Sequence, residues 1–480
     1  MAYPATTVNR ISEPFEETSS SMWGLVEVFI LIQFLWGALL FLPGAQSFRM
    51  SVRILPYFSS LALFAFYYGN RQRYRMPAAG KFVVIALLLL VINLAHPQTQ
   101  LMAGAAQCVF QFCIVAPVFW AGKAVKSPRY LNRLLWLIFI VNAANSLVGL
   151  LQIYFPQYFM PPEFSSLAQS MNRDHVEALS YQGASGQMII RPPGLSDMPA
   201  GAAVAGMTTA LMGIALSMRR EWGARTRTFC LAMSGVGMVV LYLTQVRSLF
   251  LMMVAAICAL LTVVVRRGQR WEAVWASLTS LALVVGAFLW AISLGGKTVA
   301  DRFFGITEVG LFNSFQSNRG FFVEQTINTL LFEYPLGAGV GRWGMMTVYF
   351  GDLASIESPP IHVEIQMTGW LLDGGVLMML FYGSAVVSAL LYCYRRAVRS
   401  ADIEMVSAAR IIFCFNLIIA GTTLAGPSFN TQLGIQFWFL TAALHGCGVG
   451  LTRRPRDARR QHGGAMLGSE ASAGISEVRR

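Results

Sequence analysis

Charged side chains are scarce in this 480-residue chain: they make up 12% of its residues, whereas hydrophobic residues make up 55%. Soluble domains carry about 25% charged residues. This scarcity excludes an ordinary soluble enzyme and indicates an integral membrane protein with a single membrane domain. The formal net charge of +13 would suit nucleic acid, but the Lys and Arg residues stand in short clusters between apolar runs. Nucleic acid is therefore not an expected partner.

Several motifs that mark common chemistries are also missing. None of the seven cysteines forms a CxxC pair, which excludes the usual disulfide framework and zinc patterns. The chain has no Walker motif, no HExxH motif and no carboxylates at metal-ligand spacing. We therefore predict no required metal and no cofactor. Acidic residues before the first apolar run exclude a cleavable signal peptide, so this run should remain as a membrane helix.

Apolar runs recur along the chain at the length that a membrane helix needs, roughly 20 residues. About twelve are present: 22–43, 54–70, 82–96, 101–121, 134–155, 199–218, 228–246, 248–265, 273–295, 367–394, 405–425 and 431–451. The sequence predicts an all-α polytopic membrane protein with about 12 transmembrane helices in a domain over 22–452. A tail at 1–21 precedes it. A basic, disordered tail at 453–480 follows and should contact the headgroups of membrane lipids.

The positions of the basic clusters predict the orientation. Clusters that fall on one side of the predicted bundle are Arg71–Arg75, Lys123–Arg133, Arg219–Arg227, Arg266–Arg270, Arg395–Arg399 and the tail from Arg453. The positive-inside rule makes that side cytoplasmic, so both termini are expected there. Two long inserts, 156–198 and 296–366, are then extracytoplasmic, where nucleotide sugars and ATP are not at hand.

The second insert contains a predicted amphipathic helix that ends before Tyr334-Pro335. Ser317 or Asn318 is expected to cap it, which places Arg319 in its first turn. Free backbone N–H groups and a guanidinium together suit a phosphate group. The alternative is a surface arginine on a helix at the membrane interface.

Two further arginines adjoin apolar runs. Arg247 lies in a tight hairpin between two runs, at a depth where a charge is costly and usually functional. Its alternative role is to extend to the lipid headgroups. Arg191 begins the rigid segment Arg-Pro-Pro-Gly194. It either points at the same space as Arg247 or pairs with Asp197.

His362 is the candidate base. It follows Ser358-Pro-Pro360, so Ser358 is expected to cap the next span, with His362 about one turn inside. The positive end of a helix disfavours imidazolium, which keeps the ring neutral and able to accept a proton, although Glu364 opposes this effect. A structural histidine is the alternative role, and His175 in the first insert is the competing base.

Between Arg319 and His362 lies the run Pro-Leu-Gly-Ala-Gly-Val-Gly341, followed by Arg342. Backbone amides at Gly337, Gly339 and Gly341 could form a nest for an anion, with Arg342 beside them. The alternative is a flexible turn. Together with Arg191 and Glu364, these residues are the candidates for binding a diphosphate or the rest of the substrate.

The order of these motifs resembles that of the O-antigen polymerase/O-antigen ligase family of bacterial envelope enzymes, from about Arg191 to Gly375. The motifs are RPPG at 191–194, VRS at 246–248, NRG at 318–320, YPLGAGVG at 334–341, IHVEIQ at 361–366 and DGG at 373–375. The resemblance implies that Arg247, Arg319 and His362 are the functional trio. One departure is Val363, where the family often has Asn.

The resemblance implies a membrane glycosyltransferase in the bacterial inner membrane, with its active site facing the periplasm. Its donor would be a polyprenyl-diphosphate-linked oligosaccharide. Arginines would stabilise the departing diphosphate, His362 would take the proton from the acceptor hydroxyl, and attack opposite the leaving group would invert the anomeric centre. A chain-length regulator and a flippase of the same pathway are further expected partners.

Four functions remain open at this point, one of which is an assembly scaffold without catalysis. A polymerase for O-antigen or exopolysaccharide joins lipid-linked repeat units to one another. The long first insert and the proline-rich segment at Arg191 favour this function. A ligase transfers the glycan to lipid A-core or protein. A flippase or transporter would need charges deep within its spans, which are nearly absent here, and the paired broken helices typical of transporters are not visible.

Overall fold

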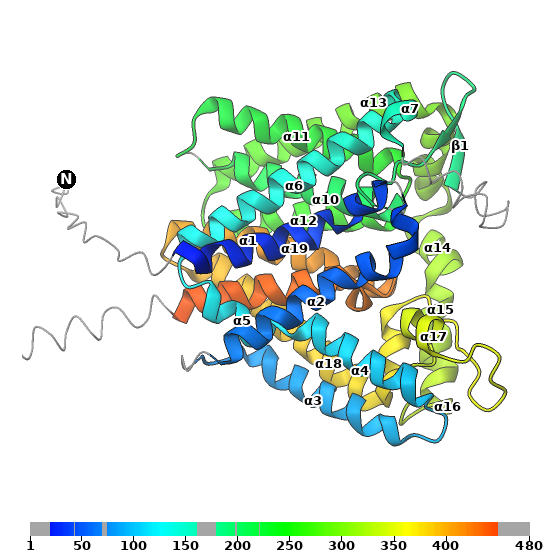
Figure 1. Ribbon diagram of the computed structural model, residues 1–480. Helices are drawn as coiled ribbons and strands as arrows, with labels where there is room; N and C mark the ends of the chain where they lie inside the picture. Colours follow the sequence, from blue (N-terminus) through cyan, green and yellow to red (C-terminus); the bar gives the residue numbers. More distant parts are fainter. Residues whose placement is uncertain are drawn as a thin grey trace, which may run out of the picture.

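The computed structural model describes residues 20–42, 44–69, 74–160, 179–196, 199–219 and 221–449. Its helices lie side by side in one bundle (Figure 1). The long helices are α1 (Ser20–Leu35), α2 (Arg49–Tyr68), α3 (Ala78–Ile92), α4 (Leu101–Val115), α6 (Pro128–Tyr154), α10 (Pro199–Ser217), α11 (Ala224–Leu243), α12 (Arg247–Arg266), α13 (Arg270–Val309), α18 (Gln366–Arg399) and α19 (Ile403–Gly421). A last helix covers 432–449.

The short elements connect these helices. Short α-helices are α5 (Pro117–Ala124), α7 (Pro156–Phe159), α14 (Leu311–Phe315), α15 (Phe321–Gln325), α16 (Leu331–Glu333) and α17 (Gly344–Phe350). The 3-10 and π turns are η1 (Trp36–Phe41), η2 (Ala45–Phe48), η3 (Asn93–Ala95), η4 (Gln316–Gly320), η5 (Thr326–Leu330), η6 (Thr422–Leu424) and η7 (Ser428–Asn430). Two strands, β1 (Ser180–Gln182) and β2 (Met188–Ile190), form an antiparallel pair.

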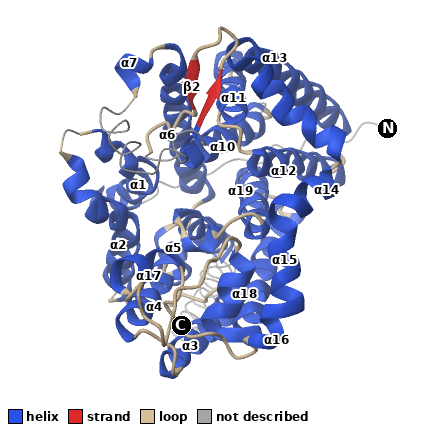
Figure 2. Ribbon diagram, turned by 90° about the vertical axis from the view of Figure 1, so that its right-hand side faces the viewer, coloured by secondary structure: helices blue, strands red, loops and turns tan. Residues whose placement is uncertain are grey.

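Eleven helices in the described ranges are long and apolar enough to cross a membrane. This confirms that the chain is an all-α polytopic membrane protein, with the small β1–β2 hairpin as the exception seen in Figure 2. Each predicted apolar run coincides with a helix, including the last run and the helix at 432–449. The run that begins at residue 101 is interrupted before Pro117, since α5 has proline in its first turn.

Two spans are kinked at glycines that the packing requires. α13 bends at Gly296, where φ is 63°. α18 bends at Gly374 and Gly375, and at Gly375 φ is 70°. A Cβ atom at Gly375 would lie 2.4 Å from the carbonyl oxygen of Pro335. The kink therefore lets the chain of the second insert cross α18 in direct contact with its backbone.

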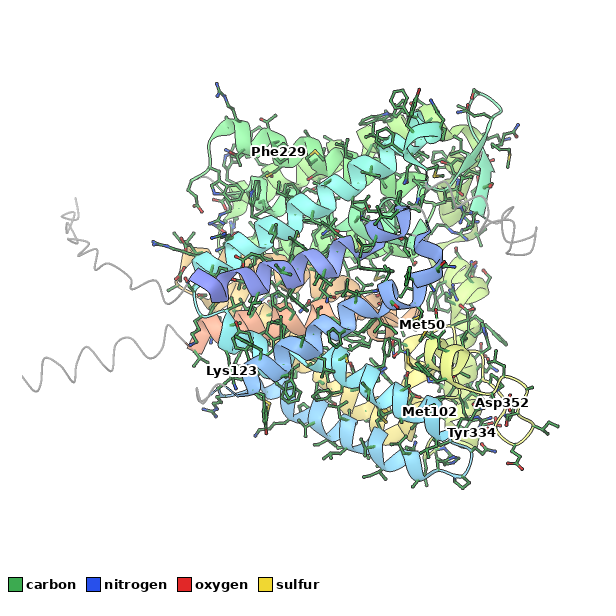
Figure 3. All side chains as sticks on the ribbon, in the orientation of Figure 1. Met50, Met102, Lys123, Phe229, Tyr334 and Asp352 are labelled. Atoms are coloured by element: carbon green, nitrogen blue, oxygen red, sulfur yellow. The ribbon has the colours of Figure 1, made fainter. Side chains whose placement is uncertain are left out.

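The bundle has two chemically different ends. We call one the insert end. It carries the β1–β2 hairpin and α14 to α17 on the right of Figure 1, together with Met102, Tyr334 and Asp352 in Figure 3. We call the other the basic end, where Lys123 is located (Figure 3). Bonds between basic loops join this end: Arg129 pairs with Glu404, and Arg267 donates to the carbonyl of Ser400 at 3.0 Å.

Candidate functional site

Arg319 lies inside a continuous helix. The segments α14, η4, α15, η5 and α16 follow one another without a break from 311 to 333, and we call this stretch the insert helix. It begins after Gly310, where φ is 84°, so the prediction of a cap at Ser317 or Asn318 is wrong. Both of those side chains bond back to the carbonyl of Ser314. The predicted end before Tyr334 is confirmed.

His362 lies in an extended segment rather than in a helix. α18 begins at Gln366 with Ile365 before it, so the prediction of a cap at Ser358 is wrong. Tertiary bonds hold the chain extended: the amide of Ile361 donates to the carbonyl of Arg342 at 2.7 Å. The hydroxyl of Ser358 meets that of Ser355 at 3.1 Å instead of capping a helix.

Arg319 and His362 are joined through one carboxylate. Nη1 of Arg319 donates to Oε2 of Glu364. Nε2 of His362 lies 2.7 Å from Oε1 of the same side chain. Two candidate residues that are far apart in the sequence are therefore directly linked. Since Glu364 uses both of its oxygens here, it acts on the two candidates rather than as a free ligand for substrate.

Glu364 also determines which nitrogen of His362 can act as a base. Burial raises the pKa of Glu364, but the bonds from Arg319 and His362 outweigh this effect and lower the pKa below its ordinary value. An ionised carboxylate can only accept hydrogen bonds, so Nε2 must carry the proton of the neutral ring. Nδ1 is then the proton acceptor. The imidazole ring is open to a substrate because 76% of the side chain is exposed.

A second group at the insert end consists of three arginines. The positive charges of Arg247 and Arg191 both act on Arg302, which places the three within electrostatic range of one another. Arg247 begins α12 after a turn in which Gln245 has a φ of 57°. Arg302 lies beyond the kink of α13, and nothing in the local sequence marked it. Within the described part of the chain, none of the three forms an ion pair with a carboxylate.

Arg191 is held in place by its backbone. Its amide donates to the carbonyl of Leu179 at 2.9 Å, next to the β1–β2 hairpin. The segment after it is clamped onto α6, where the side chain of Gln152 bonds both the amide and the carbonyl of Gly194. Burial lowers the pKa of Arg191, and nearby Tyr181 partly opposes this. Its buried Nε has no hydrogen-bond partner in the described structure. The alternative partner, Asp197, lies outside the described residues.

Arg342 does not face a ligand, contrary to the sequence hypothesis. Only 3% of the residue is exposed, and its guanidinium donates to the carbonyls of Pro359 and Ala338 and to Oε1 of Gln98. Burial lowers its pKa. Arg342 therefore fastens the second insert to the end of α3 and to the segment that carries His362.

The glycine run is a packed loop rather than an open anion nest. Gly337, Gly339 and Gly341 all have positive φ, between 76° and 104°. A Cβ atom at Gly341 would lie 2.5 Å from the backbone of Ala103 and Gly104. The amide of Gly341 bonds to the buried carboxyl group of Asp373, and that of Gly337 donates to the carbonyl of Tyr334 at 3.0 Å. These amides therefore have partners within the protein and are not free for an anion.

Asp373 is a residue whose role the sequence did not reveal. It is fully buried in α18. It accepts from Nε1 of Trp343 at 2.9 Å and from Nε2 of Gln107 at 3.1 Å, in addition to the amide of Gly341. The signals in the sequence were one acidic residue within an apolar run and its place in the DGG motif at 373–375, and neither indicated this structural role. Asp373 connects the loop of the second insert to α4 and α18, and so supports the position of the His362 segment.

A cavity of about 450 Å³ is lined by residues from several helices, and none of the candidate site residues is among them. One wall, from Leu195 to Ala205, follows the Arg191 segment. Another includes Trp343, which forms a small buried cluster with Ala338 and Leu372. Ile361 and Val363, the neighbours of His362, pack against this cluster. Viewed from the insert end in Figure 2, α12 and α13 lie on one side and α17 and α18 on the other.

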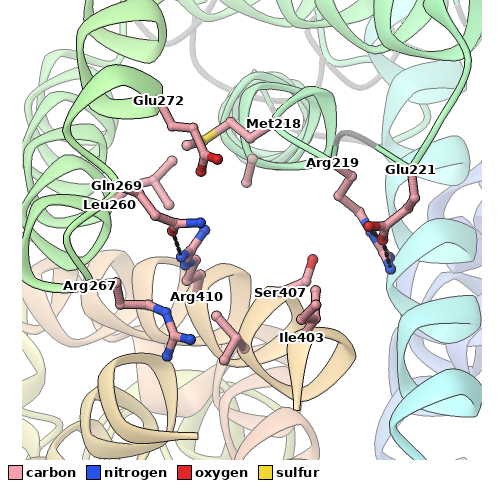
Figure 4. A pocket seen from close by; sticks show the side chains of 12 residues that line it. Met218, Arg219, Glu221, Leu260, Arg267, Gln269, Glu272, Ile403, Ser407 and Arg410 are labelled. Atoms are coloured by element: carbon pink, nitrogen blue, oxygen red, sulfur yellow. Dashed lines mark hydrogen bonds and ion pairs between the residues drawn. The ribbon is translucent and has the colours of Figure 1, made fainter. Parts of the chain in front are cut away.

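The pocket in Figure 4 lies at the basic end and is a poorer candidate. Its arginines already have partners. Arg219 pairs with Glu221 at 2.7 Å, and Arg410 donates to Oε1 of Gln269. Arg267 donates to three carbonyls at the end of α18. These bonds join helix ends rather than leave a charge for a ligand.

No group of three His, Cys, Asp or Glu residues that could hold a metal occurs among the residues the structure describes. The competing base His175 lies outside those residues. The chain matches no protein-family model, and no curated protein matches it.

Proposed function

We propose that the protein is a membrane glycosyltransferase that polymerises repeat units carried on polyprenyl diphosphate. The observation that carries the proposal is the linked Arg319–Glu364–His362 group. It lies at the same end of the bundle as three arginines that form no ion pair with a carboxylate in the described part of the chain. The first group can remove a proton, and the second can neutralise an anion. Transfer of a glycan from a lipid diphosphate requires both.

In the proposed reaction, Nδ1 of His362 takes the proton from an acceptor hydroxyl as its oxygen attacks the anomeric carbon. The bond from that carbon to the diphosphate breaks, and both of its electrons leave with the polyprenyl diphosphate. Arg191, Arg247 and Arg302 stabilise the departing charge, because donors held in place before the reaction need no reorganisation. Attack opposite the leaving group inverts the anomeric centre.

Glu364 would serve as a positioning residue. Its carboxylate keeps Nε2 of His362 protonated and stabilises the imidazolium that forms, in the way that the aspartate of a hydrolase triad supports its histidine. Arg319 holds the carboxylate and keeps further N–H donors for the substrate. The proposal needs no metal, since fixed guanidinium groups provide the positive charge.

The proposal also includes the setting of the reaction. The protein would reside in the bacterial inner membrane with both termini in the cytoplasm and the insert end in the periplasm. The positive-inside rule supports this orientation, because the described basic loops gather at the opposite end. The donor carries its own energy in the diphosphate, which suits a compartment without nucleotide sugars.

Reconstitution with a lipid-diphosphate oligosaccharide, followed by sizing of the product, tests the function. We expect a ladder of longer lipid-linked glycans, with losses of at least 100-fold for His362→Ala and Arg319→Ala. Matched controls are His96→Gln at the same end and Arg225→Gln at the other, both expected to retain activity. Full activity of both main variants at normal protein levels would refute the proposal. Transfer only to an added lipid A-core acceptor would instead identify a ligase.

A further inference from the structure

The cavity next to the Arg191 segment has a lining that selects a particular kind of ligand. At about 450 Å³ it falls in the usual range of small-molecule sites, roughly 300–1,000 Å³. Residues from α1, α2, α6, α10, the loop at 427–431 and the last helix surround it. Six of its lining residues carry carboxamides: Gln33, Asn142, Asn145, Asn430, Gln432 and Gln436.

The charges and rings of the lining narrow the choice of ligand. Arg53 is its one charged residue, and no carboxylate is present among the lining residues. A cationic ligand would therefore find no counter-ion. Trp36, Tyr57 and Trp343 add aromatic rings, on which an apolar ring face can pack. Neutral donors and acceptors beside aromatic faces suit a sugar ring, whose hydroxyls both donate and accept.

Two buried glutamines of the cavity lining have side-chain oxygens without a hydrogen-bond partner in the described structure. Gln33 is 3% exposed and Gln436 is 6% exposed. Nε2 of Gln33 donates to the carbonyl of Pro56 at 2.8 Å, but its Oε1 and that of Gln436 accept no hydrogen bond in the described structure. Buried acceptors without partners are costly. A bound hydroxyl can satisfy each of them after a small side-chain rotation.

We propose that this cavity binds a neutral sugar residue of the glycan, through hydroxyl bonds to Gln33 and Gln436 and ring packing against Trp343. The inference rests on the proposed function, and it adds the residues that recognise the sugar. Trp343 relates the cavity to the His362 segment, because both neighbours of His362 pack against the buried cluster that Trp343 forms with Ala338 and Leu372. The sugar would thus be held next to the Arg191 segment and to this cluster.

Binding can be measured without any transfer reaction. The protein is placed in phospholipid nanodiscs, because maltoside detergents would present competing sugars. Saturation-transfer NMR is then recorded with methyl glucoside, methyl galactoside and methyl N-acetylglucosaminide as probes. We expect at least one probe to bind. Gln436→Leu and Gln33→Leu, which preserve volume but remove the amide, should weaken its binding about 3- to 10-fold.

Three further variants complete the test. Gln432→Trp fills the cavity and should abolish the signal, whereas Gln187→Leu, an exposed glutamine of the hairpin turn, should leave it unchanged. His362→Ala should bind the probe normally while losing transfer. Sugar binding without any transfer by the native protein would refute the proposed function alone.

Three results would overturn the cavity assignment. The first is the absence of binding by every neutral probe, and the second is binding that Gln436→Leu and Gln432→Trp leave unchanged. The third is a copurified lipid chain, detected by native mass spectrometry and displaced by Gln432→Trp, in a protein that gives no sugar signal. Each of these results would leave transfer activity at His362 untouched.

Discussion

The buried carboxylate of Asp373 provides the sharpest test of how the site is supported. The perturbation is Asp373→Ala, which removes the acceptor of the Trp343 indole at 2.9 Å and of the Gln107 amide at 3.1 Å. The amide of Gly341 loses the same acceptor. The loop at 335–344 should then open locally more often, whether or not the proposed reaction takes place.

The expected change in the free energy of local opening follows from the hydrogen-bond donors that lose their acceptor. A buried donor without a partner costs about 1–3 kcal/mol. The side chain of Gln107 can rotate toward another acceptor, whereas the indole and the backbone amide are fixed by their surroundings. Two orphaned donors correspond to about 2–6 kcal/mol, and a value near 3 kcal/mol is expected because such costs are not fully additive. Each 1.4 kcal/mol is a factor of ten, so local opening should increase about 100-fold.

Amide hydrogen exchange followed by mass spectrometry is the assay, since protection of a segment reports its opening equilibrium. Peptides covering 335–350 should exchange about 100 times faster in Asp373→Ala, and peptides from α12 should not change. Asp352→Ala, an exposed acid of the same insert, is the matched control. Unchanged exchange at 335–350 in Asp373→Ala would refute the view that this carboxylate holds the loop.

Three other predictions concern the loop, the carboxylate link and the orientation. Gly341→Ala should lower thermal stability, because φ is 76° and the new Cβ would lie 2.5 Å from backbone atoms, whereas Gly305→Ala, with open space around it, should not. The folded-state pKa of Glu364 is lowered. Its stabilising bonds should therefore be fully present above the unperturbed pKa of a glutamate, about 4.3, and be lost as the pH falls through the folded-state pKa. Spin-label distances between the insert helix and α18 should show this loss, and Glu364→Gln should remove the pH dependence. A cysteine at Ile356, which is 94% exposed, should react with an impermeant maleimide in intact spheroplasts, and one at Glu221 should not.

The spans were predictable because lipid imposes a simple requirement. Every backbone polar group must be satisfied within the span, so a long apolar run in a chain of this composition becomes a helix. The run that begins at residue 101 shows the limit of this rule. Its interruption before Pro117 depends on the ring of that proline rather than on the hydropathy of the run.

The candidate site was predictable in its residue types but not in its local geometry. Arg319 and His362 were chosen because cations and an imidazole stood in a polar insert. The predicted helix N-termini next to these two residues were wrong, because the preference of a residue for a capping position is weak compared with tertiary hydrogen bonds. Arg342 was a candidate for binding an anion, but its guanidinium donates hydrogen bonds to the carbonyls of Pro359 and Ala338.

The sequence by itself determined that the chain is a polytopic membrane protein and that its candidate polar residues lie in two inserts and in the hairpin at Arg247, because hydropathy and length act locally. The tertiary structure alone decided which polar groups meet. It joined Arg319 to His362 through Glu364, brought Arg302 to Arg191 and Arg247, and directed the amide of Gly341 to Asp373. Such contacts depend on where helices far apart in the chain are packed, and no local pattern encodes that placement.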